Sequence, residues 1–558
     1  MTNIEIPSGK RTKRYRFFEM LPATLSIGAI FLLIMLSLIS PTLASAYILI
    51  LVLTMFVRAI GVAFRTIQGR IALGKTSKIN WSKWLAELED PTKFAKRREK
   101  DINSREYGLK RHVLNLQRLT EMKNKYPKPS QIINMDIIAF YNESYDVLGP
   151  TMKTLAESDY DVKNNLIVVI AYEQRGGEAA LKTVREIEKH WKGVFRELIF
   201  VEHPDNMPNE VVGKGGNLTY AGKYMAKWVK ENNLDPENII ITSQDCDNRP
   251  DKKYFSYLTY EWIMTPDRQK VSFQPVCLFT NNIWDAPAPM RVIAASNSFW
   301  NVISSMRPHM LRNFASHSQG MAALIDMDFW STRTIVEDGH QYWRSYFHFD
   351  GDYHVVPLRM GIGQDAVLSD TYKKTFKAQF IQLRRWSYGA SDVAYVGNTL
   401  LRKDSKIKFW DGWSHFLRLL DGHVSQACMA PIIAFGAFVP LYLNSTAAHT
   451  SIIVNDLPLI VASVQRVAIL GLLTTVLVSL TMLPPRPKRY KKSKNIMMVF
   501  QWILMPVNAL LYNSMASYTA QIRLLCGKYM EKFDVTEKAV KKLDASEKSS
   551  NKSRKRKK

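Results

Sequence analysis

The 558-residue chain contains only four cysteines (Cys246, Cys277, Cys428 and Cys526), and no two of them form a CxxC pair. This excludes a disulfide-stapled scaffold and a cysteine-built zinc finger, and such sparse cysteine suits a reducing compartment. Acidic residues are also scarce: 50 Asp and Glu stand against 76 Lys and Arg, for a net charge of +26. With 46% hydrophobic and 23% charged residues, the chain as a whole is not of the disordered or collagen-like class.

The excess positive charge is concentrated in three patches. Residues 10–16, 484–495 and 541–558 carry net charges of five, six and seven, which account for 18 of the 26. Such an excess is typical of proteins that bind nucleic acid, an anionic membrane surface or an acidic substrate. Because the patches flank apolar runs and do not cover a folded face interleaved with aromatic residues, we expect contact with anionic membrane lipids and no nucleic-acid binding.

Two pairs of uncharged runs predict membrane-spanning helices. Residues 21–40 and 42–57 form the first pair, with Pro41 between them, and residues 425–443 and 467–483 form the second. About 20 apolar residues cross a hydrocarbon core of roughly 30 Å as a helix. The first run is longer than the apolar region of a cleaved signal peptide, and a second follows it at once, so we expect a retained membrane anchor.

The basic residues predict the orientation of these runs, since Lys and Arg collect on the cytoplasmic side. The N-terminus and residues 484–495 are therefore expected in the cytoplasm, and residues 444–456, which contain no Lys or Arg, outside it. A fifth run, residues 496–514, contains Pro506 near its middle. A single crossing would place the basic tail outside, so we expect a kinked or re-entrant helix with both ends cytoplasmic.

Between the two pairs of runs the sequence alternates strand-like and helix-like segments, which predicts an α/β domain. The expected strands are short apolar, β-branched runs at residues 134–140, 165–172, 197–202 and 238–243. In sheets of this kind, ligands bind beyond the carboxyl ends of the strands. The polar residues that follow the expected strands are Tyr141, Asn142, Glu143, Glu173, His203, Asp245 and Asp247.

The predicted organisation has eight parts. They are a basic cytoplasmic N-terminus (1–20), two transmembrane helices (21–64), a helical connector at the membrane surface (65–132), the α/β domain (133–400), an interface helix (401–424), two transmembrane helices (425–483), a basic loop with a re-entrant, interface or transmembrane helix (484–530), and a basic tail (531–558).

Two short motifs suit the binding of a metal and a phosphate. Asp245 and Asp247 are two carboxylates at a strand end, which can hold Mg²⁺ together with substrate phosphates, although solvated acidic turns have the same pattern. Residues 213–217 (GKGGN) open a helix-like stretch, where glycines let the backbone approach an anion and Lys214 adds a charge. The alternative is an ordinary glycine turn with an exposed lysine.

Two further motifs suit catalysis and sugar binding. Glu337 and Asp338 offer a carboxylate for general-base catalysis, or form an acidic helix cap. Gln382, Arg385 and Trp386 combine an amide, a guanidinium that suits a diphosphate and an indole that suits the face of a sugar ring. The alternative for this set is an anchor at the membrane interface.

Taken together and in order, these residues resemble the membrane-embedded family 2 glycosyltransferases of the cellulose synthase and hyaluronan synthase type. The similar elements are the strand-end nucleotide contact (Tyr141, Asn142, Glu143), the diphosphate-contacting element (Lys214 to Leu218), the DxD motif (Asp245, Asp247), the Thr-Glu-Asp motif (Glu337, Asp338), QxxRW (Gln382, Arg385, Trp386) and the FxVTxK gating loop (Phe533, Thr536, Lys538).

The resemblance implies a GT-A-like (Rossmann-like) cytoplasmic domain and a role for each residue. It implies catalysis by Asp338 as base with Glu337, donor binding by Tyr141, Asn142, Glu143, Glu173, Lys214, Asn217, Asp245 and Arg385, acceptor binding by Gln382 and Trp386, and Mg²⁺ or Mn²⁺ on Asp247 and Asp245. Three departures leave the donor and product open: Glu173 stands where the family has its first Asp pair, Val336 replaces a Thr, and no Pro precedes Tyr141.

The expected function is that of a membrane-bound, inverting, metal-dependent hexosyltransferase. It would move a sugar from a nucleotide-diphosphate sugar to a growing polysaccharide or a lipid-linked glycan. The first alternative is non-processive transfer of a single sugar to a lipid or lipid-linked acceptor, which the length of the product would distinguish. A catalytically inactive membrane scaffold or transporter is a remote alternative that predicts no metal-dependent turnover of nucleotide sugars.

Overall fold

The computed structural model describes residues 4–7, 9–122, 125–446 and 450–532. Its centre is an eight-stranded sheet with the strand order β3-β2-β1-β4-β7-β6-β8-β5. The strands are β1 (Ile133–Phe140), β2 (Leu166–Glu173), β3 (Glu197–His203), β4 (Ile239–Asp245), β5 (Arg249–Pro250), β6 (Val271–Leu278), β7 (His317–Gly320) and β8 (His354–Gly363). The predicted α/β class is therefore confirmed, and β1 to β4 agree with the four expected strands to within a residue or two.

The first half of the sheet is parallel, and its sequence shows why. Strands β2, β1 and β4 pair in parallel, with Asp136 of β1 beside Val168 and Thr242. Successive residues of β1 enter two separate cores: Ile138 packs into one and Ile137 into the other. Both faces of the sheet are therefore buried, which accounts for nearly continuous apolar strands in place of alternating ones.

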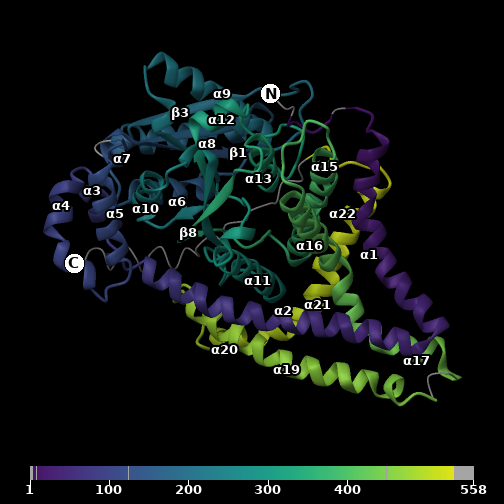
Figure 1. The fold of residues 1–558 in the computed structure, drawn as a ribbon. Helices are drawn as coiled ribbons and strands as arrows, with labels where there is room; N and C mark the ends of the chain where they lie inside the picture. Colours follow the sequence, from purple (N-terminus) through teal and green to yellow (C-terminus); the bar gives the residue numbers. More distant parts are fainter. Residues whose placement is uncertain (1–3, 8, 123–124, 447–449, 533–558) are drawn as a thin grey trace.

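Helices cover both faces of this sheet (Figure 1). One core contains residues of α6 (Tyr145–Ala156), α8 (Gly177–Trp191) and α10 (Tyr254–Met264), and the other contains residues of α9 (Lys214–Glu231) and α12 (Met321–Asp326). The domain also contains α7 (Val162–Asn165), α11 (Ala288–Ser305), α13 (Glu337–His348), α14 (Tyr372–Ser387) and α15 (Ser391–Leu400).

The second half of the sheet was not among the expected strands. Strand β7 runs antiparallel to both β4 and β6, whereas β6 pairs in parallel with β8. A β-bulge between Pro275 and Val276 interrupts the last pairing. These strands bring α11, α13 and α14 to the same edge of the sheet as the carboxyl ends of β1, β2 and β4.

Among the described residues, five helices are long and apolar enough to cross a membrane. They are α1 (Lys13–Ile39), α2 (Pro41–Thr76), the segment Phe409–Leu443 that begins with α16 (Phe409–Phe435) and ends with α17 (Val439–Leu443), α19 (Ile452–Met482), and the segment Ser493–Leu525 that comprises α20 (Ser493–Phe500), α21 (Met505–Asn508) and α22 (Met515–Leu525). Figure 1 shows α2 and α19 side by side beneath the α/β domain, with α1 along its flank.

The helices differ in extent from the runs read in the sequence. Helix α2 continues to Thr76, twelve residues beyond the expected end of the second span at residue 64. Helix α16 runs unbroken from the expected interface helix into the third expected span, as far as Phe435. The fifth apolar segment is helical throughout and contains a π-helical turn at Ala509–Ser514, just after Pro506.

The connector that follows α2 packs on the side of the domain. It forms α3 (Trp81–Glu87), α4 (Pro91–Arg97) and α5 (Leu109–Glu121). Trp81 stacks on Tyr257 of α10 with ring centroids 4.0 Å apart, and His112 of α5 bonds Tyr260 of the same helix at 2.9 Å. Aromatic burial of this kind attaches the connector to the domain.

A buried acid in β1 predicts a pH dependence of stability. Asp136 is fully buried, and neither carboxylate oxygen has a hydrogen-bond partner in the described part of the chain. Burial raises its pKa well above the ordinary value, so the folded protein holds it neutral. This contribution to stability is present at low pH. As the pH rises from the pKa of Asp136 in the unfolded chain toward its pKa in the folded protein, the free energy of unfolding falls by about 1.4 kcal/mol per pH unit.

We therefore expect Asp136→Asn, which cannot ionise, to flatten the fall in melting temperature between pH 5 and pH 8. The measurement is thermal unfolding of the detergent-purified wild type and variant across that range. Parallel curves for the two proteins would contradict the prediction.

Candidate active site

A cavity of about 420 Å³ lies at the edge of the sheet where β1, β2 and β4 end. It brings together residues as far apart in the sequence as Ala139 and His423. The predicted site residues that line it are Tyr141, Glu143, Glu173, Lys214, Asn217, Asp245, Asp247, Glu337, Asp338, Gln382, Arg385 and Trp386. Asn142 is exposed and does not line it, and Phe533, Thr536 and Lys538 lie outside the described residues.

The centre of the cavity is a buried ammonium group surrounded by carboxylates. The Nζ of Lys214 lies 2.7 Å from Asp245, 3.4 Å from Asp338 and 3.7 Å from Glu337. Burial lowers the pKa of Lys214, but the three carboxylates outweigh it and keep that pKa above its ordinary value. Lys214 is therefore a fixed positive charge, which offsets the repulsion among the acids.

The two neighbouring acids of α13 differ in exposure. The side chain of Glu337 is 4% exposed and that of Asp338 is 23% exposed. Burial and the adjacent Asp338, opposed by Lys214, raise the pKa of Glu337 to about 8. Both residues lie in the first turn of α13, where the helix N-terminus favours negative charge. One turn further on, His340 bonds Asp392 of α15 at 2.7 Å and ties α13 to that helix.

The turn after β4 carries the two aspartates of the expected metal site. Asp245 is the last residue of β4, and Asp247 is buried at 4% exposure. The Oδ2 of Asp247 accepts the backbone N–H of Asp365 at 3.2 Å, and its carbonyl accepts the amide of Asn281 at 2.9 Å. Two oxygen ligands facing one cavity fit Mg²⁺ or Mn²⁺, whose other ligands are water and phosphate. The described residues contain no cluster of three or more potential metal ligands.

Lys214 begins α9, and the glycines after it serve packing. A Cβ on Gly215 would lie 2.4 Å from the carbonyl oxygen of Ser331, and one on Gly216 would lie 2.6 Å from Glu210. The backbone of α9 therefore needs glycine to approach the segment that leads to Glu337. The expectation that these glycines let the backbone approach a phosphate stays a prediction.

Helix α14 presents three of the predicted residues on one face. Gln382, Arg385 and Trp386 are spaced three and four residues apart, which aligns them on a helix. The amide of Gln379 donates to Gln382 at 3.1 Å. Trp386 lines the cavity and is 37% exposed, and its ring lies 6.1 Å from that of Phe279.

At the other end of the cavity an arginine accompanies the predicted residues. Arg175 forms an ion pair with Glu173, and its guanidinium lies 4.5 Å from the ring centroid of Tyr141. Glu143 turns its carboxylate back to accept the backbone N–H groups of Tyr141 and Asn142, at 2.8 and 3.2 Å, so it shapes the turn after β1. The side chain of Asn217 is similarly occupied in part, since its amide donates to the Ala171 carbonyl at 2.9 Å.

The sequence reading missed several other residues of the cavity wall. Arg312 lines it but forms no hydrogen bond or ion pair within the described ranges; its guanidinium carbon lies 5.8 Å from the Trp343 ring. Burial lowers the pKa of Arg312. His423 of α16 and Trp300 of α11 also contribute to the wall. Asn297, Trp300 and Asn301 share one face of α11, a spacing that the sequence does display.

The chain was compared with known proteins. No model of a known protein family matches it, and no curated protein matches it. Among solved structures, it is similar to a mannosyltransferase from Pyrobaculum calidifontis in complex with GDP-mannose and Mn²⁺ (13% identity, TM-score 0.38), with 75% of this chain and 95% of that chain covered.

Two further solved structures are similar to the chain. They are TarS of S. aureus (10% identity, TM-score 0.28, 70% and 55% of the two chains) and GalNAc-T7 with UDP, GalNAc and Mn²⁺ (10%, 0.30, 54% and 61%). Similarity at this level does not determine activity or substrate.

The contact between Gly215 and Ser331 predicts how the site tolerates substitution. We expect Gly215→Ala to destabilise the protein by about 1–3 kcal/mol, because its methyl group must displace a backbone carbonyl. Gly339→Ala is the matched control, since a Cβ on Gly339 meets nothing within 4 Å. The measurement is the melting temperature of both variants. Equal values for the two would contradict the prediction.

Proposed function

We propose that the chain is a membrane-bound inverting glycosyltransferase of the family 2 type, which transfers a hexose from a nucleotide-diphosphate sugar to a glycan or lipid-linked acceptor. The observation that carries the proposal is the convergence of Asp245, Asp247, Lys214 and Asp338 with the α14 residues on one cavity at the strand ends. Separately, each motif has an ordinary structural explanation. Together they form a site with an acid pair, a fixed cation, a carboxylate base and an indole.

The donor would bind between the turn after β4 and the start of α9. Asp247 and Asp245 would hold Mg²⁺ or Mn²⁺, which when bound neutralises charge on the leaving diphosphate. Lys214 and Arg385 line the same cavity and offset that charge from the protein side. Tyr141, with Arg175 against its ring, flanks the region where the nucleotide base would lie.

Asp338 is the group best suited to accept a proton from the acceptor hydroxyl. Its carboxylate is partly exposed to the cavity, whereas Glu337 is almost fully buried. As this proton is removed, the hydroxyl oxygen attacks the anomeric carbon. The new carbon–oxygen bond forms while the bond from the anomeric carbon to the diphosphate breaks, in a single displacement. The anomeric configuration is inverted in such a step. Gln382 and Trp386 would orient the acceptor.

The proposed location of the domain is the cytoplasmic side of the membrane. It rests on the three basic patches, which the positive-inside rule places there. Basic residues near an anionic leaflet each contribute about 1 kcal/mol to binding. The proposed gating loop, with Phe533, Thr536 and Lys538, follows Lys532, which forms a parallel bridge with Val212 next to the cavity.

Replacement of the proposed base tests the mechanism. We expect Asp338→Asn to keep donor binding and to lower transfer by at least about 100-fold, because general-base catalysis contributes on the order of 10²–10⁴. The measurement is donor-dependent nucleotide release by the purified protein across a panel of nucleotide sugars, with Mg²⁺ or Mn²⁺. Asp404→Asn, an exposed aspartate paired with Arg402, is the control. Wild-type turnover by Asp338→Asn would exclude this base.

One observation favours the alternative of single transfer to a lipid-linked acceptor that carries phosphate. The guanidinium of Arg312 faces the cavity without an ion pair in the described part of the chain, and the nearby wall includes His423 of α16, a helix long and apolar enough to cross a membrane. The charge of Asp392 acts on Arg312 but forms no ion pair with it in the described residues, and an arginine desolvated in this way suits a bound anion. A neutral growing polysaccharide supplies none.

Arg312→Gln distinguishes these acceptors. If the acceptor carries phosphate, we expect transfer to farnesyl phosphate to fall about 10- to 100-fold, as for loss of a charged hydrogen bond, while donor hydrolysis is unchanged. Farnesol and inorganic phosphate are the controls for the apolar chain and the free anion. If the variant instead forms long polymer at the wild-type rate, as judged by product length on a gel, the polysaccharide acceptor is supported and the anionic one is excluded.

A further inference from the structure

The first described residues of the chain lie against the segment that leads into α13. The carbonyl of Ile4 accepts the hydroxyl of Tyr395 at 2.8 Å, and that of Ile6 accepts Nη1 of Arg333 at 2.8 Å. Ile6 itself is 7% exposed and packs into a core with residues of α13 and α15. The N-terminal segment is therefore a part of the folded domain, ahead of the membrane helix α1.

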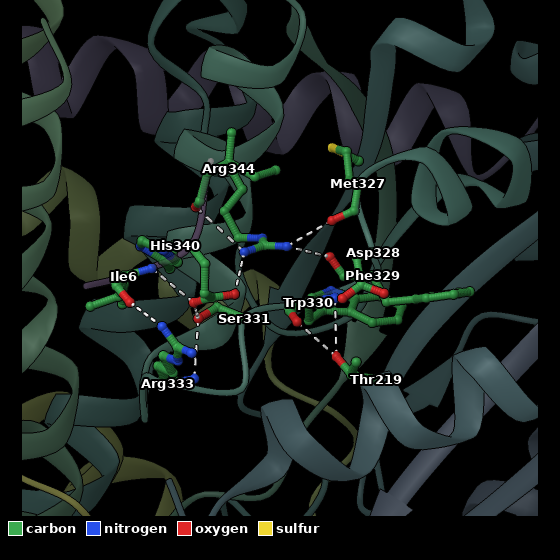
Figure 2. A network of polar contacts seen from close by, with 12 residues as sticks. Ile6, Thr219, Met327, Asp328, Phe329, Trp330, Ser331, Arg333, His340 and Arg344 are labelled. Carbon is green, nitrogen blue, oxygen red and sulfur yellow. Dashed lines mark hydrogen bonds and ion pairs between the residues drawn. The ribbon is translucent and has the colours of Figure 1, made fainter. Parts of the chain in front are cut away.

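Glu5 makes the central contacts of this segment. Its carboxylate accepts the hydroxyl of the fully buried Ser331 and Nη1 of Arg344 at 2.6 Å. Arg344 is 2% exposed, and its Nη2 donates to the carbonyls of Met327 and Phe329 at 2.8 and 3.2 Å. Figure 2 shows Arg344 joining Met327 on one side to the neighbourhood of Ser331 on the other.

The segment from Met327 to Val336, here called the α13 approach loop, needs such support. It contains no helix or strand, and both Asp328 and Phe329 have a positive φ, near +60°, which side chains other than glycine rarely adopt. Thr219 of α9 holds the loop through the N–H and carbonyl of Trp330 at 3.1 and 2.8 Å (Figure 2). A conformation of this kind persists only where its surroundings determine it.

The same loop contacts the helix that carries the central lysine. The carbonyl of Thr332 accepts the N–H of Val211 at 2.8 Å, and the carbonyl of Ser331 lies against Gly215, next to Lys214. The loop ends at Val336, and α13 begins with Glu337, six residues after Ser331. A displacement of Ser331 would therefore change the positions of Lys214, Glu337 and Asp338.

We propose that Glu5 is a positioning residue that clamps the α13 approach loop and so sets the geometry between Lys214 and Asp338. It touches neither the donor nor the acceptor site, and it acts through Ser331 and Arg344. The clamp also ties the catalytic domain to its anchor, because α1 begins at Lys13, eight residues after Glu5. The effect on turnover rests on the proposed function, whereas the effect on the loop does not.

Glu5→Gln tests the clamp, since it keeps the size of the side chain and removes the charge that pairs with Arg344. We expect kcat for nucleotide release to fall about 10- to 100-fold, because a small displacement of catalytic groups slows the reaction by such a factor. The KM for the donor should stay within about twofold of the wild-type value. Hydrogen exchange of the full-length protein in detergent should become faster in residues 327–336. Glu5→Asp, which retains the charge, should recover part of kcat. Glu188→Gln, an exposed glutamate of α8, is the control.

Ser331→Ala removes the same contact from the other side and is the second variant, in case Glu5→Gln fails to fold. The double variant should lose no more than the worse single variant, because both act through one contact. Unchanged exchange in residues 327–336 with unchanged kcat overturns the proposal. Faster exchange throughout the domain together with a lowered melting temperature also overturns it, because Glu5 would then stabilise the whole domain and not this loop in particular. A wild type without nucleotide-sugar turnover refutes the proposed function, and exchange then still decides the clamp.

Discussion

The buried ammonium of Lys214 holds together the part of the molecule in which the acids meet. Asp245, Glu337 and Asp338 lie between 2.7 and 3.7 Å from it, and their side chains are 32%, 4% and 23% exposed. Carboxylates this close repel one another strongly when the surroundings have a low dielectric constant, and each loses hydration. The lysine offsets that repulsion only if the end of β4, the start of α9 and the start of α13 stand in one arrangement. Contacts outside the cavity wall support this arrangement: Gly215, next to Lys214, packs on Ser331, and Glu5 pairs with Arg344.

The cavity joins two environments. At one end, Tyr141 and Glu173 follow strands of the parallel sheet, and at the other, Trp386 and His423 belong to helices that pack among the long apolar ones. Under the proposed function, the nucleotide sugar would bind near the first set of residues and the acceptor near the second. Helix α11 strengthens this connection, because Val302 packs directly on Gly69 of α2. The domain is thus held on the apolar helices through side-chain packing as well as through the chain.

Local patterns in the sequence were enough for several features. Strands β1, β2 and β4 were found because both of their faces are buried, which leaves uninterrupted apolar runs, and the edge strand β3 because it has a short apolar run of its own. The face of α14 was found because helical periodicity aligns Gln382, Arg385 and Trp386. Features that depend on distant partners left no local signal. Strands β6, β7 and β8 are defined by pairing across about 45 to 85 residues, and Glu5 meets partners more than 300 residues away. Glu143, which was expected at the nucleotide, lines the cavity, and its carboxylate also accepts the backbone N–H groups of its own turn, a contact that periodicity does not reveal.

The sequence by itself determined the class of the domain, the apolar helices and the residue types available for chemistry, since these follow from periodicity, charge and motif spacing along the chain. Only the tertiary structure decided that Lys214 lies among Asp245, Glu337 and Asp338, that Arg312 faces the cavity and that residues 4–6 support the loop before α13. The physical reason is that burial and electrostatic pairing depend on which segments meet in space. A pattern within one segment specifies its own conformation but not the charges that another segment brings beside it.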